Sequence, residues 1–323
     1  MLLAIAAIVI GLLVLVLSAD RFVEAAAALA HHFGVSTLLI GMVILGFGTS
    51  APELTVSVIS AVEGRPALAL GNAFGSNIAN IALILGVVAL LKPVPVHSQV
   101  IRRELPILAV VTVLVLWQIY DGILSQWDAA GLLIVFAGVM LWSVVRGRGN
   151  HADTLTEEVN QQLARLDRSP KWAAAWLVLG LLLLIGSSRL LVWGAVTIAQ
   201  LFGVSDLIIG LTVVAIGTSL PELAASIAAT RKGENDIAVG NVVGSNLFNT
   251  LAVIGLAGVI EPIEVPPEAL SRDWPFMVGL TLAVFVFGYG KGREGVINRW
   301  EGALLLASFV GYTGFLIIQQ QGA

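Results

Sequence analysis

Two glutamates stand in nearly identical short segments that lie far apart in the chain. Glu53 ends the segment Gly-Thr-Ser-Ala-Pro-Glu, which begins at Gly48, and Glu222 ends the segment Gly-Thr-Ser-Leu-Pro-Glu, which begins at Gly217. Carboxylate, hydroxyl and carbonyl oxygens are the ligands that hard cations prefer, and Ca²⁺ takes about six to eight of them. The two segments therefore indicate a cation site built from oxygen.

The spacing within each segment places these oxygens on one face of a helix. Thr49 precedes Glu53 by four residues and Ser50 precedes it by three, so both hydroxyls lie beside the carboxylate on a helix. Pro52 has no N–H for the carbonyl four residues earlier, so we expect the helix to kink or break there and to free carbonyl oxygens as ligands. The second segment has the same residue types at the same spacing: Thr218, Ser219, Pro221 and Glu222.

A second polar face follows each of these segments. Ser76 and Asn80 are four residues apart, with Asn72 and Asn77 nearby, and the later copy of this face consists of Ser245, Asn249, Asn241 and Asn246. Glycines in the same stretches leave room for close helix packing: Gly71, Gly75, Gly240 and Gly244. The combined set predicts an all-oxygen cage between the two copies.

The composition places this cage in a membrane. The 323 residues are 58% hydrophobic and 12% charged, and their mean hydropathy is +0.95, which excludes a soluble fold. There is no cysteine, so thiolate metal sites and disulfides are excluded. We expect a bilayer as the surroundings, no nucleic-acid partner, and ten membrane helices at about 2–31, 37–61, 66–91, 103–118, 127–146, 172–200, 206–230, 235–259, 273–288 and 297–319.

The loop charges predict the orientation of these helices. With the N-terminus outside, the cytoplasmic loops hold thirteen of the seventeen Lys and Arg residues, so the positive-inside rule predicts both termini outside. The long polar stretch 147–171 is expected to be a cytoplasmic linker. It separates a first half, 1–146, from a second half, 172–323, and each half contains five predicted helices.

An odd number of helices in each half means that the second copy enters the membrane in the opposite sense. Inverted repeats of this kind enclose a substrate site near the bilayer midplane and are typical of alternating-access transporters. Two carboxylates balance the charge of one Ca²⁺ or two Na⁺. We expect no enzyme activity, because neither Ser50 nor Ser219 has a repeated His or Lys beside it to act as a base. A passive channel fits inverted repeats less well.

The pattern Gly-Thr-Ser-x-Pro-Glu followed by Gly-Asn-x-x-Gly-Ser-Asn, present twice, resembles the alpha repeats of the cation/calcium antiporter superfamily, especially its prokaryotic sodium/calcium exchanger branch. The resemblance implies an all-α membrane protein whose second and seventh helices are discontinuous. It further implies that the long first and sixth helices slide against a core of helices two, three, seven and eight. The implied ion ligands are Glu53, Glu222, Thr49, Ser50, Thr218, Ser219, Ser76, Ser245, Asn80 and Asn249, with backbone carbonyls near Gly46 and Ala215.

The expected function is therefore exchange of calcium for sodium. A proton/calcium antiporter that uses the same two glutamates remains the alternative. Some members of this superfamily have an acidic residue where this chain has Asn80 or Asn249, and the two asparagines argue against potassium dependence. We expect no cofactor apart from the transported Ca²⁺ and Na⁺, a site that one chain completes, and a prokaryotic plasma (inner) membrane location.

Overall fold

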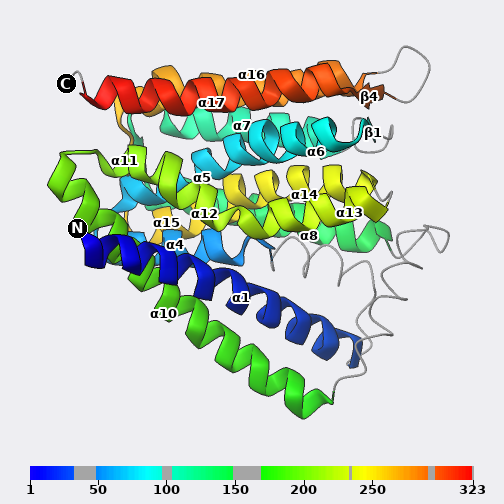
Figure 1. The fold of residues 1–323 in the computed structure, drawn as a ribbon, viewed down its shortest axis with the longest axis horizontal. Coiled ribbons are helices and arrows are strands. Elements are labelled where there is room, and N and C mark those ends of the chain that lie inside the picture. Colours follow the sequence, from blue (N-terminus) through cyan, green and yellow to red (C-terminus); the bar gives the residue numbers. More distant parts are fainter. Residues whose placement is uncertain (33–48, 97–103, 148–168, 233–234, 290–294, 322–323) are drawn as a thin grey trace.

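The computed structural model describes residues 1–32, 49–96, 104–147, 169–232, 235–289 and 295–321 (Figure 1). Gly46, most of the predicted linker and the start of the predicted helix 37–61 lie outside these residues. The described part is almost entirely helical, as predicted. Its elements follow the predicted boundaries to within a few residues.

The first half contains five helical segments. In chain order these are α1 (Leu2–His32); α4 (Ala51–Val62); a continuous run of α5 (Pro66–Ile78), η2 (Ala79–Leu85) and α6 (Gly86–Leu91); α7 (Leu105–Ile119); and α8 (Gln126–Gly147). The label η denotes a π-helical turn. These segments correspond to the five helices expected between residues 2 and 146.

The second half repeats this order. It contains α10 (Pro170–Phe202); the run α11 (Asp206–Ile209), η4 (Gly210–Val214), α12 (Ala215–Thr218) and α13 (Leu220–Lys232); the run α14 (Asn235–Phe248), η5 (Asn249–Val253) and α15 (Ile254–Ile260); η6 (Ala269–Asp273) with α16 (Trp274–Gly288); and α17 (Arg299–Gln321). Helix α10 begins two residues before the predicted start. The Ser169 hydroxyl accepts a hydrogen bond from the Trp172 N–H and so caps the helix at that point.

Length and composition agree with a membrane-spanning bundle. Within the described residues, five helices are long and apolar enough to cross a bilayer, and five shorter apolar helices accompany them. Large apolar side chains are exposed along several of these helices, including Leu13 on α1, Leu182 on α10 and Ile318 on α17. Such exposed apolar surface fits lipid surroundings.

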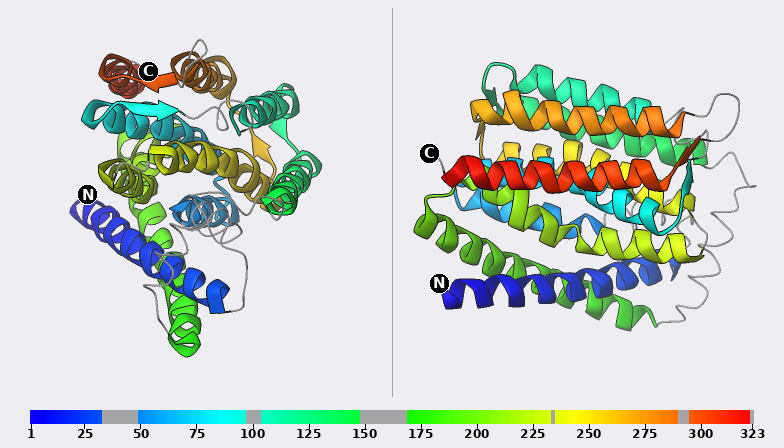
Figure 2. Two further views of the ribbon diagram at one scale, coloured as in Figure 1. Left: turned by 90° about the vertical axis from the view of Figure 1, so that its right-hand side faces the viewer. Right: turned by 45° about the horizontal axis from the view of Figure 1, so that its top comes forward.

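The long helices α1 and α10 lie side by side along one flank of the bundle (Figure 1). They pack closely where Gly11 faces Ser187 and Leu191 and where Gly194 faces Ala4. The start of α1 and the end of α17 lie at the same end of the bundle (Figure 2). This placement agrees with an even number of membrane crossings.

Two short antiparallel sheets join the halves, and the sequence did not predict them. Strand β1 (Val94–Val96) of the first half pairs with β4 (Gly295–Ile297) of the second, and β2 (Ile123–Leu124) pairs with β3 (Ile263–Glu264). Each sheet thus takes one strand from each half. The backbone hydrogen bonds of these strands fix the loops of one half to those of the other.

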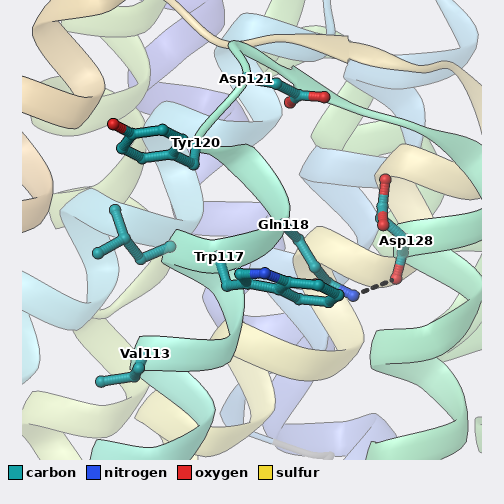
Figure 3. A pocket seen from close by; sticks show the side chains of 7 residues that line it. Val113, Trp117, Gln118, Tyr120, Asp121 and Asp128 are labelled. Atoms are coloured by element: carbon teal, nitrogen blue, oxygen red, sulfur yellow. Dashed lines mark hydrogen bonds between the residues drawn. The ribbon is translucent and has the colours of Figure 1, made fainter.

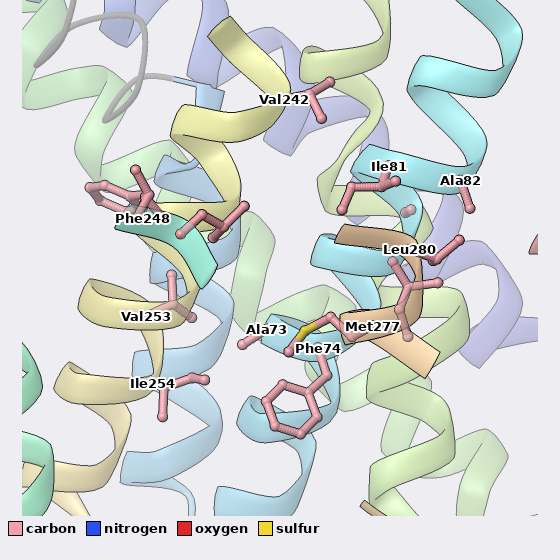
Figure 4. Close-up of a cluster of buried hydrophobic side chains, with 14 of the residues drawn as sticks. Ala73, Phe74, Ile81, Ala82, Val242, Phe248, Val253, Ile254, Met277 and Leu280 are labelled. Carbon is pink, nitrogen blue, oxygen red and sulfur yellow. The ribbon is translucent and has the colours of Figure 1, made fainter. Parts of the chain in front are cut away.

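The apolar core also draws on both halves (Figure 4). Phe74 and Ile81 of the first half are buried in the same cluster as Phe248, Val253 and Met277 of the second. The ring of Phe248 meets that of Phe136 edge to face, with ring centroids 5.3 Å apart. Neither half buries this apolar surface alone, so the two halves form one folded unit.

Two of the four predicted packing glycines lie at a close helix contact between the halves. A Cβ atom on Gly75 would lie 2.6 Å from the Ala215 Cβ and 2.7 Å from the Leu211 Cα, and Gly71 faces Leu207 just as closely. By the offset of 169 residues, the counterparts of Leu207, Leu211 and Ala215 fall within 33–48, outside the described part. Close packing is therefore confirmed for the first copy and stays a prediction for the second.

We expect Gly75→Ala to destabilise the protein, because the backbone of Leu211 must move to admit the methyl group. Overpacking of this kind costs about 1–3 kcal/mol. Gly138→Ala is the matched control, because Gly138 is also helical and a Cβ there meets nothing within 4 Å. Thermal unfolding of the purified protein in detergent measures both variants. An unfolding temperature for Gly75→Ala equal to that of Gly138→Ala would contradict this packing.

Candidate cation-binding site

The predicted helix breaks are present, but they lie at the serines rather than at the prolines. Ser219, with φ −85° and ψ 6°, separates α12 from α13, and Ser50, with φ −90° and ψ 6°, immediately precedes α4. Pro52 and Pro221 fall in the first turn of the helix that follows each break. Proline is tolerated there because a first-turn residue needs no N–H for the helix, so the break comes two residues earlier than predicted.

This position of the break places each glutamate at a helix N-terminus. Glu53 is the third residue of α4 and Glu222 is the third residue of α13. The first N–H groups of a helix have no intrahelical acceptor, and the helix dipole is positive at this end, so a carboxylate is stabilised there. Both side chains are 0% exposed.

The two halves exchange hydrogen bonds at the glutamates. The Ser50 hydroxyl donates to Oε1 of Glu222 over 3.2 Å, and the Ser219 hydroxyl donates to Oε1 of Glu53 over 3.1 Å. Each serine hydroxyl therefore donates a hydrogen bond to the carboxylate of the other half. The structure brings Glu53, Glu222, Ser50 and Ser219 together as the sequence predicted.

The second carboxylate oxygen of each glutamate is buried and has no hydrogen-bond partner among the described residues. Buried polar atoms in native proteins almost always have a partner, so such atoms mark a place for one. The same holds for further predicted ligands, which supply unpartnered oxygens: Ser76 Oγ, Ser245 Oγ, Asn80 Oδ1 and Asn249 Oδ1. All six side chains are 0% exposed. Two carboxylate and four neutral oxygens are a donor set that suits Ca²⁺ or Na⁺ as transported substrates.

The predicted threonines are hydrogen-bonded to two asparagines that the sequence placed on the second polar face but not among the implied ligands. Thr218 Oγ1 lies 3.2 Å from Oδ1 of Asn72, and Thr49 Oγ1 lies 3.4 Å from Oδ1 of Asn241. The signal that pointed to these asparagines was their recurrence in both copies of the pattern. The carbonyl oxygen of Ala215, a predicted ligand, accepts a hydrogen bond from the Ser219 N–H over 3.1 Å.

The helices widen at Asn80 and Asn249. Asn80 lies in η2 and Asn249 begins η5, so both asparagines are in π-helical turns. Such turns are rare and occur often at functional sites, because the extra residue frees backbone groups and changes the direction of side chains. Asn80 donates through Nδ2 to Oδ1 of Asn246 over 3.0 Å, whereas neither polar atom of the Asn249 amide has a partner in the described residues.

A surface pocket beside Trp117 and Gln118 does not resemble the cage, because its carboxylates already have hydrogen-bond partners (Figure 3). Its two carboxylates hold local backbone: Asp121 accepts a hydrogen bond from the Ile123 N–H, and Asp128 accepts one from the Ser125 N–H. Within the described residues, no three side chains of His, Cys, Asp or Glu come together as a metal cluster. The cage therefore relies on two carboxylates and neutral oxygens.

Comparison with known sequences places the chain in a family. Residues 3–145 and 172–318 match the family described as sodium/calcium exchanger protein. The chain is 46% identical over 316 residues to CaxA of Alkalimonas amylolytica, an alignment that covers 97% of this chain and 98% of that protein. It is 42% identical over 318 residues to the inner membrane protein YrbG of Escherichia coli, with 98% and 97% covered. It is 30% identical over 339 residues to the sodium/calcium exchanger MaX1 of Methanosarcina acetivorans, with 94% and 96% covered.

The fold agrees with this assignment. A solved structure of the sodium-calcium exchanger NCX_Mj, soaked with 2.5 mM Na⁺ and 10 mM Sr²⁺, is 28% identical in sequence and superposes with a TM-score of 0.67. The superposition covers 97% of this chain and 98% of that one. The resemblance deduced from the repeated motifs is confirmed, and so is the transporter rather than enzyme class. The chain belongs to the sodium/calcium exchanger family.

Proposed function

We propose that the protein exchanges calcium for sodium by alternating access at the cage between its halves. The observation that carries this proposal is the pair of buried glutamates, each with one oxygen hydrogen-bonded to a serine of the other half and one oxygen without a partner. The names of MaX1 and NCX_Mj, both sodium–calcium exchangers, support the choice of coupling ion. The predicted ligands, including the carbonyls near Gly46 and Ala215, belong to this proposal.

Charge balance makes the two ions compete. Two ionised glutamates neutralise one Ca²⁺ or two Na⁺, and a mismatch of one charge in a low-dielectric interior costs several kcal/mol. The site is therefore stable with one bound Ca²⁺ or with two bound Na⁺, but not with Ca²⁺ and two Na⁺ bound together. Exchange follows, because entry of one ion requires the other to leave.

Access alternates, in this proposal, as α1 and α10 slide against a core formed by the second, third, seventh and eighth predicted helices, which are α4 to α6 and α11 to α15. These two helices contact one another along their length and lie on one flank of the bundle (Figure 1). Leu12 of α1 packs against Gly217, the residue before the predicted ligand Thr218. A shift of α1 along the bundle would carry this leucine past the end of the cage. The proposed setting is a prokaryotic plasma (inner) membrane, in line with the name of YrbG, with both termini outside and 147–171 as a cytoplasmic linker.

We expect calcium-45 uptake by proteoliposomes to be driven by internal sodium. Vesicles loaded with sodium, with potassium or with acid are compared at one fixed membrane potential. Uptake in the sodium-loaded vesicles alone supports the proposal, and external potassium should have no effect, because both cage asparagines are neutral. Uptake driven by the acid load instead would assign the proton-coupled function to the same cage.

Glu53→Gln and Glu222→Gln should each abolish calcium uptake. Each change removes one of the two charges that hold the ion, which weakens binding by more than about a hundredfold. Glu264→Gln is the control, because Glu264 is an exposed residue of β3. Size-exclusion chromatography establishes that the variants fold. Near-normal uptake in either cage variant would remove the basis of the proposed site.

A further inference from the structure

We infer that Asn72 and Asn241 are positioning residues of the cage. Each donates a hydrogen bond to the backbone carbonyl of the glutamate in its own half and accepts one from the threonine hydroxyl of the other half, so that the lone pairs of the threonine oxygen face the ion. The inference rests on the proposed function, because it assigns a task to the cage threonines as ion ligands.

The contacts of Asn72 use its whole amide. Its Nδ2 group donates to the backbone carbonyl of Glu53 over 3.1 Å and to the Ser57 hydroxyl over 2.9 Å. Its Oδ1 atom receives the Thr218 hydroxyl over 3.2 Å. A carbonyl oxygen can only accept, so the N–H groups must face Glu53 and the amide oxygen must face Thr218. The side chain is 0% exposed, so water cannot replace these partners.

Asn241 makes the same three contacts in the second copy. Its Nδ2 group lies 3.4 Å from the backbone carbonyl of Glu222 and 3.2 Å from the Ser226 hydroxyl, and its Oδ1 atom receives Thr49 Oγ1 over 3.4 Å. Ser57 and Ser226 are therefore part of the repeated pattern as well. The same arrangement formed by two separate stretches of sequence shows that it belongs to the repeated unit.

Chemistry explains why a threonine ligand needs this partner. A hydroxyl has one proton and two lone pairs, and it binds a cation only through a lone pair. The proton must therefore point away from the ion, toward an acceptor. The acceptors near the Thr218 hydroxyl are Oδ1 of Asn72, the carboxylate of Glu53, and the helix carbonyls of Val214 and Ala215, which lie 3.0 and 3.3 Å away. Without the asparagine, the proton turns to its own helix or to the carboxylate, and the lone pairs turn with it.

The second contact acts on the glutamate. Helix α4 begins directly after the break at Ser50, and Glu53 lies in its first turn. A hydrogen bond from Asn72 to the Glu53 carbonyl ties this turn to α5, which also carries the predicted ligand Ser76. One amide therefore sets the relative positions of three predicted ligands: Glu53, Ser76 and Thr218.

A double-mutant cycle on calcium binding by the purified protein tests this inference. We expect Asn72→Ala and Thr218→Val each to raise the half-saturating calcium concentration by about tenfold, and the double variant to raise it far less than the product of the two. Asn241→Ala with Thr49→Val should behave in the same way. The exchanged pairs, Asn72→Ala with Thr49→Val and Asn241→Ala with Thr218→Val, should give the full product, because the hydrogen bonds of each asparagine join it to the other threonine.

Controls separate positioning from folding. Thr112→Val should bind calcium like the unchanged protein, because among the described residues the Thr112 hydroxyl bonds only to the Leu108 carbonyl of its own helix, over 2.7 Å. If Asn72→Ala does not fold, Asn241→Ala makes the same test in the other copy, and Asn72→Ser is the milder variant. Unchanged calcium affinity in a folded asparagine variant, or full products in all four pairs, would overturn the inference. If Glu53→Gln abolishes binding in the same assay, the proposed function stands while the inference alone fails.

Discussion

The burial of two carboxylates in an apolar interior is the constraint on which the rest of the structure depends. An ionised carboxylate without partners costs several kcal/mol in such surroundings, so every nearby element must supply compensation. Glu53 and Glu222 obtain it from helix N-termini created by the breaks at Ser50 and Ser219, and from a serine hydroxyl of the opposite half. The compensation is incomplete, because one oxygen of each carboxylate has no partner in the described part of the chain. A cation is the partner with the right charge.

Hydrogen bonds at the site run from each half to the other, so both halves are needed to form it. The Ser50 hydroxyl donates to Glu222, and the Ser219 hydroxyl donates to Glu53. Asn72 and Asn241 each accept a hydrogen bond from a threonine of the opposite half. The sheets and the apolar core cross it too, since each sheet takes one strand from each half. A half by itself would leave both its glutamate and its apolar face without partners. The pairing of two similar halves is therefore what makes the buried charges tolerable.

Much of this arrangement was predictable from sequence because its causes are local or repeated. Helix periodicity gave the membrane segments, the recurrence of Gly-Thr-Ser-x-Pro-Glu gave the two halves, and four-residue spacing grouped Thr49 with Glu53 and Ser76 with Asn80. The π-helical turns were not predictable, because widening a turn by one residue leaves composition and hydropathy unchanged. The strands of two or three residues are too short to show an alternating pattern, and they are stabilised by pairing with distant segments. The roles of Asn72 and Asn241 depend on contacts across the halves, which no spacing within one helix encodes.

One of the positions at which the copies differ is Thr250, and this difference changes the hydrogen bonds beside the cage. The Thr250 hydroxyl of the second half accepts a hydrogen bond from Nδ2 of Asn77 over 2.9 Å. The equivalent residue of the first half is Ile81, which has no hydroxyl to accept one from Asn246. Asn246 donates instead to the backbone carbonyl of Asn77 over 3.3 Å, and its oxygen receives Nδ2 of Asn80.

The amide of Asn80 is therefore fixed with its oxygen unpartnered, whereas its copy, Asn249, has no hydrogen bond from either amide atom in the described residues. The charge of the cage follows from what the two halves share. The difference between the hydrogen bonds of Asn80 and Asn249 follows from a residue at which the two halves differ.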